Sequence, residues 1–404
     1  MGSIKKIIFF SHMLFCKRDY ERFGIKTLQD NGFEVEYWDF APFLYPRAFQ
    51  EVRVPDPFQF YGCRYFSNLN ELKEAISGLD KTSFIISFIS YGLDSYGIFK
   101  AISQKKLKFC VCVVGSSYPG VSIGPIETER RFKPAMILSN TLNKLLKLNM
   151  RRVFRCHLFP RIPFRFLGVR SADLILDGAV VDQKAYSGFY PVDKNSELLN
   201  IHCFDYDSFL VESKKPFQVD NKVGVFLDEY LPFHPDKFYE DNPIAIKPVD
   251  YYASLCRFFN YLEKNSGVKI IIAAHPRSHY EKHQDYFEGR KVIRGQTIKL
   301  VRESGFVLAT QSTSINYAVL FQKPILIIST DAINQTIYFN CISCIANTLG
   351  KQIININRPF MIDWEKERMV DKDKYANFKQ LYIKNSGTEE LPFWQVVANR
   401  ISKY

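Results

Sequence analysis

Short apolar runs alternate along the chain with segments whose apolar residues recur at helical spacing. The runs are rich in Val, Ile and Phe and are too unbroken for strands with one solvated face, so they predict buried strands of a parallel sheet. The segments between them predict helices, which together give an α/β fold. In the first half the predicted strands are residues 4–10, 33–38, 84–90 and 108–114, with a helix at 18–31, and in the second half a helix is predicted at 249–265.

Three apolar runs in the second half are each followed by a short polar motif. The runs are KVGVF, VKIIIAA and GFVLAT, and the motifs that follow them are Asp228-Glu229, His275-Pro276 and Ser312-Thr313-Ser314. The carboxyl ends of parallel strands lie at one edge of a sheet, where turns expose side chains and backbone N–H groups. We therefore expect the three motifs to converge on a single site.

The length of the chain predicts more than one hydrophobic core. Its 404 residues, 47% of them hydrophobic, are enough for two domains. A polar segment at 212–222 suggests the boundary. We predict a Rossmann-like domain at 1–215, a second Rossmann-like domain at 216–385 that faces it across a cleft, and a helix within 386–404 that packs back on the first domain.

The charge of the chain favours polyanionic partners. Lys and Arg number 54 against 42 Asp and Glu, a net charge of +12. No nucleic-acid-binding motif accompanies this charge, so we predict no nucleic-acid partner. In residues 151–170 arginines alternate with bulky apolar residues, which suits either an anionic membrane surface or a basic face over an interdomain contact. No run approaches the length that spans a bilayer, so we predict a cytoplasmic protein, peripheral on the inner membrane if it meets a membrane at all.

The histidine and hydroxyl motifs suit phosphate chemistry. Ser312, Thr313 and Ser314 would cap the helix that follows them, and their hydroxyls and nearby N–H groups could bind an oxyanion. His275 could donate a hydrogen bond to a phosphate or protonate a leaving group, with Pro276 opening the next helix. A second His-Pro pair, at 234–235, lies in a predicted loop and not after a strand, so it is interpreted as a decoy.

The adjacent acids suit proton transfer or nucleophilic attack. In extended backbone the side chains of Asp228 and Glu229 point to opposite sides, so one of the two is expected to face the cleft. There a carboxylate could take a proton from an acceptor hydroxyl or attack an anomeric carbon. The structural alternative is a solvated acid pair at a strand end.

Together the three segments resemble those of bacterial transferases that use CMP-activated sialic acids or Kdo and have the two-domain glycosyltransferase B (GT-B) fold. The resemblance extends over about residues 222–330. The family has an acidic-acidic-Gly motif, a His-Pro motif and a Ser-Ser/Thr motif, and this chain departs from the first at Tyr230, where the family usually has glycine. The matching segments are LDEY at 227–230, AAHPR at 273–277 and QSTSINYAVLFQKPI at 311–325.

The resemblance implies a GT-B-like glycosyltransferase. It would move a 2-keto-3-deoxy sugar acid (a sialic or other nonulosonic acid, or Kdo) from its CMP donor to a bacterial surface glycan such as lipopolysaccharide or capsule. The first domain would bind this acceptor and the second the donor, with no metal and no cofactor, and the anomeric centre could be inverted or retained. The implied catalytic residues are Asp228 or Glu229 together with His275, and the implied donor-binding residues are His275, Pro276, Arg277, Ser312, Thr313 and Ser314.

Three other functions compete with this one. A transferase of polyol phosphate from a CDP donor would use further histidines, for which His279 and His283 are candidates. A metal-dependent sugar transferase could use the acids of Asp205-Tyr206-Asp207. A non-catalytic membrane-associated scaffold would depend on the basic stretch 151–170 alone.

Overall fold

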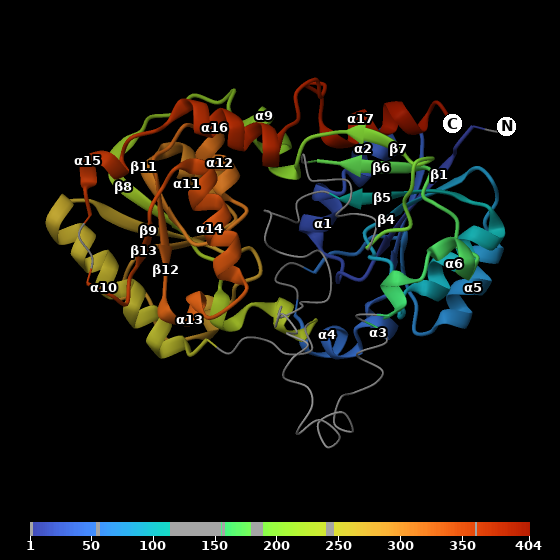
Figure 1. The fold of residues 1–404 in the computed structure, drawn as a ribbon, viewed down its shortest axis with the longest axis horizontal. Coiled ribbons are helices and arrows are strands. Elements are labelled where there is room, and N and C mark those ends of the chain that lie inside the picture. Colours follow the sequence, from blue (N-terminus) through green and yellow to red (C-terminus); the bar gives the residue numbers. More distant parts are fainter. Residues whose placement is uncertain are drawn as a thin grey trace, which may run out of the picture.

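Two parallel sheets, each covered by helices, lie side by side in the molecule (Figure 1). The computed structural model describes residues 3–53, 57–113, 155, 158–178, 189–239, 246–359 and 362–404. Every strand pair recorded within the two sheets is parallel. The α/β class predicted from the unbroken apolar runs is therefore confirmed.

The first sheet has seven strands within the described residues, in the order β3-β2-β1-β4-β5-β6-β7. One face packs on α5 and α6, and the other faces α2, α9 and the C-terminal helix. Its strands are β1 (Lys6–Ser11), β2 (Glu34–Asp39), β3 (Cys63–Tyr65), β4 (Ser83–Ser87), β5 (Lys108–Val113), β6 (Leu174–Asp177) and β7 (Glu197–Asn200). Its helices are α1 (Lys17–Arg22), α2 (Ile25–Asp30), α3 (Ala41–Leu44), α4 (Pro46–Glu51), α5 (Leu69–Ser77), α6 (Tyr96–Lys105) and α9 (Phe204–Glu212).

The second sheet has six strands in its described part, in the order β10-β9-β8-β11-β12-β13. These strands are β8 (Asp220–Leu227), β9 (Lys269–Ala274), β10 (Val292–Arg294), β11 (Ser304–Ala309), β12 (Ile325–Ser329) and β13 (Ile353–Asn355). The helices are α10 (Pro248–Ser266), α11 (Thr297–Glu303), α12 (Ile315–Leu320), α13 (Asp331–Asn334), α14 (Tyr338–Leu349), α15 (Trp364–Glu367), α16 (Lys372–Phe378) and a π-helix at Lys379–Ile383. Short 3-10 turns include η6 (Leu231–Phe233), η7 (Pro235–Phe238) and η8 (Tyr280–Lys282).

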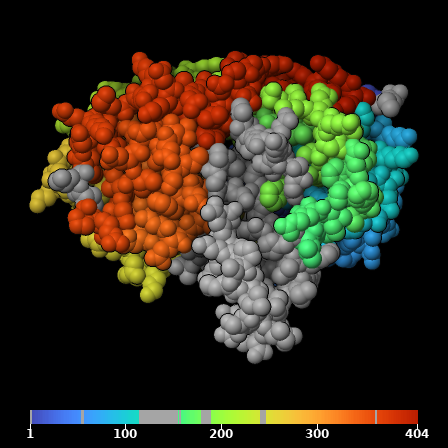
Figure 2. Space-filling model, viewed as in Figure 1, coloured from blue at the N-terminus to red at the C-terminus, as the bar shows by residue number. Residues whose placement is uncertain are grey.

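The chain returns to the first sheet at its C-terminal end. Helix α17 (Phe393–Ile401) contacts α2, and the C-terminal residues run over the top of both halves in Figure 2. The Trp394 ring meets the Phe9 ring edge-on at 5.1 Å, and its Nε1–H donates to the Arg22 carbonyl oxygen at 2.7 Å. Phe9 is a core residue of β1, so this helix completes the core of the first sheet.

One predicted helix is two helices. The spacing predicts a continuous helix over 18–31, but α1 ends at Arg22 and α2 begins at Ile25. Gly24 between them has a left-handed backbone, with φ of +51°. A Cβ at this position would lie 2.3 Å from Cδ1 of Trp394, so the break brings the backbone close to α17.

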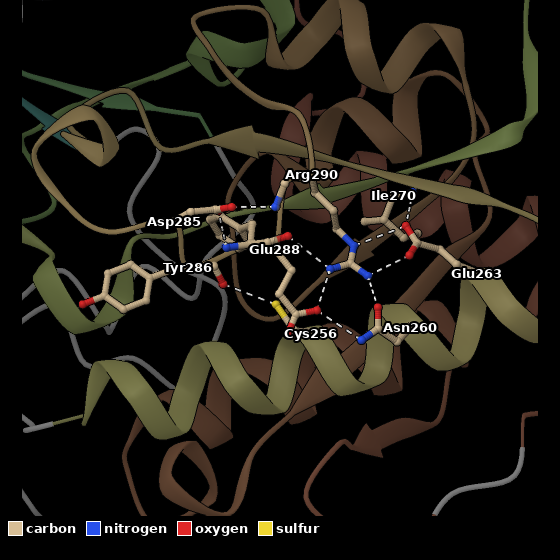
Figure 3. A network of polar contacts seen from close by, with 10 residues as sticks. Cys256, Asn260, Glu263, Ile270, Asp285, Tyr286, Glu288 and Arg290 are labelled. Carbon is tan, nitrogen blue, oxygen red and sulfur yellow. Dashed lines mark hydrogen bonds and ion pairs between the residues drawn. The ribbon is translucent and has the colours of Figure 1, made fainter.

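A polar network holds α10 against the turn that precedes β10 (Figure 3). The Arg290 guanidinium, with a side chain 8% exposed, donates to both carboxylate oxygens of Glu263, at 3.2 and 2.7 Å. Glu263 also accepts the backbone N–H of Ile270 at 3.0 Å. The bidentate geometry fixes the C-terminal half of α10 to the start of β9 and so positions the strand that His275 follows.

Part of the basic stretch 151–170 lies outside the described residues, namely 151–154 and 156–157. Within the described part, Arg165 pairs with Asp193 and Arg170 with Asp173, while Phe166 is 85% exposed. In the portion of the chain that can be described, no helix has both the length and the apolar character needed to cross a bilayer.

Candidate active site between the two sheets

The three polar motifs of the second half lie at the ends of neighbouring strands. Strand β8, which precedes Asp228, pairs with β9 on one side and with β11 on the other. His275 follows β9 directly, and the Ser-Thr-Ser segment follows β11 after two residues. The predicted placement at one edge of the sheet is confirmed, because strands far apart in sequence are adjacent in space.

Asp228 is buried and connects β8 to the turn after β9. Its side chain, in a residue that is 3% exposed, accepts the backbone N–H of Tyr230 at 3.0 Å and that of His275 at 3.4 Å. It also accepts the Tyr280 hydroxyl at 2.9 Å, and that hydroxyl lies 2.8 Å from the hydroxyl of Tyr252. Burial raises the pKa of Asp228 to about 6, although these donors oppose the shift. Asp228 thus fixes the backbone that carries the imidazole of His275.

Glu229 points the other way and connects β8 to the end of β11. It accepts the Thr310 hydroxyl and, at 2.8 Å, the backbone N–H of Gln311. Burial raises the pKa of Glu229 to about 7. The two acids diverge as extended backbone requires, but both are buried, since Glu229 is only 9% exposed. The structural alternative, a solvated acid pair at a strand end, does not agree with this burial.

His275 and His234 lie side by side in the same local geometry. Their rings are 4.8 Å apart. In each, Nδ1 accepts the backbone N–H of the residue two positions later, Asp236 after His234 and Arg277 after His275, both at 3.2 Å. An Nδ1 that accepts leaves the proton of a neutral imidazole on Nε2. Burial, His234 and the Arg277 and Arg18 guanidinium groups hold the pKa of His275 well below its usual range, so it is neutral at pH 7.

The structure bears on two expectations about these histidines. His234, interpreted from sequence as a decoy, is the ring beside His275, because the segment after β8 folds back toward the end of β9. Pro276 does not open a helix. It begins a turn in which the Ser278 N–H donates to the His275 carbonyl oxygen at 2.9 Å.

Arg277 adds a cation to the histidine pair. Its side chain is 15% exposed and donates to Asp236 at 2.8 Å, while its Nε is buried without a partner among the described residues. Burial disfavours the charged form of Asp236, but Arg277 and His234 outweigh that effect and lower the pKa of this carboxyl. A buried guanidinium N–H without an acceptor is costly, so this group is suited to receive an oxyanion.

The Ser-Thr-Ser segment forms a turn before α12. Ser314 occupies the N-cap position, but its side chain makes no capping hydrogen bond. Instead its backbone N–H donates to the Ser312 hydroxyl oxygen at 3.3 Å. Thr313 is exposed at the surface. The predicted side-chain cap is therefore replaced by a hydroxyl-centred turn, because Ser312 reaches the N–H two residues on.

A third histidine comes from the first sheet, and the sequence patterns did not single it out. His12 follows β1 directly. Its ring lies 4.9 Å from Tyr45 and 6.0 Å from Tyr239, the residue just after η7. Burial lowers the pKa of His12 to about 4 although Asp236 opposes this, and its Nδ1 is buried without a described partner. The available signal was the same as for His275, a histidine at the carboxyl end of an apolar run.

Other candidate residues are engaged elsewhere. His283 lies 2.6 Å from the Tyr230 hydroxyl, and His279 lies 3.1 Å from Glu281. In α9, Asp205 accepts from Asn316 and Tyr317 at 2.9 and 3.1 Å, while Asp207 accepts the Phe393 N–H at 2.8 Å. The two acids thus bind different helices and do not converge on one point. Within the described ranges no cluster of three His, Cys, Asp or Glu side chains is suited to a metal ion.

Comparisons with known proteins bear on the fold. No protein-family model matches the chain, and no curated protein matches it. Among solved structures, the wall teichoic acid polymerase TagF is similar with a TM-score of 0.50 at 12% identity, over 99% of this chain and 89% of that chain. UDP-GlcNAc 2-epimerase from Methanocaldococcus jannaschii matches with a TM-score of 0.43 at 10% identity, over 98% of both chains. The likeness to TagF shows the fold, which is GT-B-like as predicted.

Proposed function

We propose that this chain is a transferase that passes a group from a nucleotide-activated donor to a glycan acceptor. The observation that carries the proposal is the group of side chains at the facing strand ends: His234, His275 and Arg277 from the second sheet and His12 from the first. In open α/β sheets this edge is where ligands bind. Three imidazoles and a guanidinium at two facing edges of this kind suit a phosphate and a proton transfer.

The second sheet would bind the departing phosphate. Neutral His234 and His275 each present an Nε2–H, and Arg277 presents a buried Nε–H that no described residue accepts. Charge accumulates on the phosphate oxygens as the bond to the donor breaks, and preorganised donors stabilise that charge more than the ground state. The hydroxyls of Ser312, Thr313 and Ser314 would complete this binding set from the neighbouring strand end.

His12 would act as the general base on the acceptor side. Its low pKa keeps it neutral at pH 7, and the approach of a phosphate would make it more basic. The acceptor hydroxyl gives its proton to a ring nitrogen of His12 while its oxygen forms a bond to the anomeric carbon. The bond from that carbon to the phosphate oxygen breaks, and the electron pair leaves with the nucleotide.

The buried acids have a different role in this scheme from the one that the family resemblance implies. Asp228 accepts the His275 N–H and Glu229 accepts the Gln311 N–H. Both would be positioning residues that hold the donor-binding turns, and neither would contact the acceptor. Asp228→Asn should then reduce turnover mainly through a higher KM, whereas loss of a catalytic base would reduce kcat.

The preferred donor is a CMP-linked 2-keto-3-deoxy sugar acid, and the preferred acceptor is a bacterial surface glycan, both taken from the motif resemblance. The second candidate is transfer of polyol phosphate from a CDP donor. The second histidine beside His275 favours this reaction. Two imidazoles can both donate to the oxygens of a phosphoryl group that is itself transferred. In that case the acceptor oxygen would attack phosphorus and CMP would leave.

The test is nucleotide release from CMP-sialic acid, CMP-pseudaminic acid, CMP-Kdo and CDP-glycerol, with and without a chelator. We expect turnover of one donor in the presence of chelator, reduced at least ~100-fold in His275→Gln, His234→Gln and His12→Gln. His279→Gln is the matched control and should retain activity. Wild type that neither releases nor binds a nucleotide would reject the proposal and favour a scaffold.

A further inference from the structure

Helix α1 lies on the side of the first half that is nearest the second half (Figure 1). Arg18 and Arg22 are four residues apart and therefore share one face of this helix. The Arg22 guanidinium lies 4.7 Å from the Phe204 ring. The residue after Phe204 is Asp205, which accepts from Tyr317 in the first turn of α12. The face that carries Arg18 is thus directed at the region where the Ser-Thr-Ser turn enters α12.

Arg18 is incompletely paired within the described part of the chain. Its Nη2 is 3.4 Å from Asp19 Oδ1, a long contact, and Asp19 Oδ2 already accepts the Cys16 thiol at 3.0 Å. The Nε of Arg18 is buried and has no partner there. Arg277 shows the same combination, one carboxylate contact and a buried Nε without a partner.

The two guanidinium groups approach the site from opposite sheets. Arg277 follows His275 by two residues. Burial and His234 lower the pKa of the His275 imidazole, and the charges of Arg277 and Arg18 lower it further. A guanidinium carries five N–H donors in a plane, so each can bind an oxyanion through two parallel hydrogen bonds. A single phosphate that already accepts from two imidazoles does not need the free N–H donors of both guanidinium groups.

We infer that the donor carries a second oxyanion beside its reacting phosphate, and that Arg18 from the first sheet binds it. This inference rests on the proposed function and adds the residue that would bind the second group and so select for donors that carry one. Two chemistries would supply the second group: a carboxylate on the anomeric carbon of a sugar acid, or the second phosphate of a nucleoside diphosphate. A neutral sugar on a nucleoside monophosphate would leave Arg18 without its ligand and would bind weakly.

The experiment is isothermal titration of the full chain with CMP, CMP-sialic acid, CMP-Kdo, CDP and CDP-glycerol. Wild type is compared with Arg18→Gln, with Arg18→Lys, which keeps the charge but not the planar fork, and with the control Lys17→Gln on the same helix. We expect Arg18→Gln to weaken binding of the true donor about 10- to 100-fold while CMP affinity changes less than about 2-fold. Arg18→Lys should lie between, and Lys17→Gln should match wild type.

The ligand arms separate the two sources. Weaker binding of a CMP-linked sugar acid alone assigns Arg18 to the carboxylate, whereas weaker binding of CDP and CDP-glycerol assigns it to a second phosphate. Equal weakening of CMP and every donor, or no weakening in either Arg18 variant, overturns the inference while leaving the transferase proposal intact. Wild type that binds no nucleotide at all overturns both.

Discussion

The two His-Pro units of the second half share one local geometry. In each, the proline restricts the backbone after histidine, and Nδ1 takes the N–H of the residue after proline. This fixes the tautomer and directs Nε2–H away from the turn. The motif at 273–277 could be selected from sequence because it follows a strand. The unit at 234–236 could not, because only the fold of the segment after β8 brings it to the same place.

Glu229 should make folding stability depend on pH. Its folded pKa, about 7, lies above its ordinary value of 4.5, so the neutral acid stabilises the fold at low pH. This contribution is complete below about pH 4.5 and is lost as pH rises through about 7. Relative to Glu229→Gln, wild type should lose up to about 3 kcal/mol of unfolding free energy between pH 5 and pH 8. Urea unfolding across this range measures the difference.

The Glu229→Gln reference keeps an oxygen that can accept from Thr310 and Gln311, so the comparison isolates ionisation. It also cancels the opposite pH dependence of His275, whose lowered pKa costs stability as pH falls. A wild-type to variant difference that stays constant from pH 5 to pH 8 would show that Glu229 is ionised throughout, and the account of its burial would be wrong.

Tyr230 has a left-handed backbone, the conformation that favours glycine. Its φ is +56°, its N–H donates to Asp228, and its hydroxyl lies 2.6 Å from His283. Tyr230→Gly should relieve about 1 kcal/mol of backbone strain but lose a ring that is 4% exposed, for a net loss of about 2–4 kcal/mol. Tyr230→Phe should cost only about 1 kcal/mol. Chemical denaturation tests both, and a glycine variant as stable as wild type would contradict the packing argument.

At the scale of elements, long periodic segments and unbroken runs were predictable, and breaks were not. The periodicity predicts a helix at 249–265, and α10 occupies Pro248–Ser266. The run before His275 becomes β9. The predicted helix at 18–31 fails at Gly24, because a single glycine does not oblige a helix to end. The left-handed turn there depends on α17, which is more than 350 residues away in the sequence.

Arg290 should stabilise the element pair formed by α10 and β9. Removing it leaves Glu263, whose side chain is 27% exposed, without its bidentate partner. We expect Arg290→Ala to lower the free energy of unfolding by about 2 kcal/mol, and Arg290→Lys to recover less than half of it, because an ammonium cannot donate in parallel. Lys264→Ala, at an exposed position of the same helix, is the control. Thermal and urea unfolding provide the measurement, and equal stability of Arg290→Lys and wild type would contradict the role of the fork.

At the scale of the molecule, the sequence predicted one side of the site and missed the other. The second sheet contributes three motifs that each follow a strand, and their convergence follows from parallel topology alone. His12 satisfies the same rule, but its relation to Asp236 and Tyr239 depends on how the two sheets face each other. That arrangement is set by long-range packing, which no local period encodes. Arg18 was missed for the same reason.

The two sheets share one hydrophobic cluster, so they should unfold together. The cluster includes Phe9 of the first sheet, Val225 of the second, and Trp394 of α17. Gly24→Ala forces a Cβ to within 2.3 Å of the Trp394 ring, and together with the left-handed backbone this should cost about 2–4 kcal/mol. It should also separate the unfolding of the two halves. Gly32→Ala is the control: its φ is +88°, but nothing lies within 4 Å of the added Cβ.

The measurement is urea unfolding followed by both tryptophan fluorescence and far-UV circular dichroism. Wild type and Gly32→Ala should give coincident transitions, with Gly32→Ala shifted by about 1 kcal/mol through backbone strain alone. In Gly24→Ala the fluorescence transition should precede the dichroism transition, because α17 leaves the first sheet before the second sheet melts. If Gly24→Ala gives coincident transitions and loses no more unfolding free energy than Gly32→Ala, α17 does not couple the sheets. The arrangement of the site between the sheets would then depend on the facing loops alone.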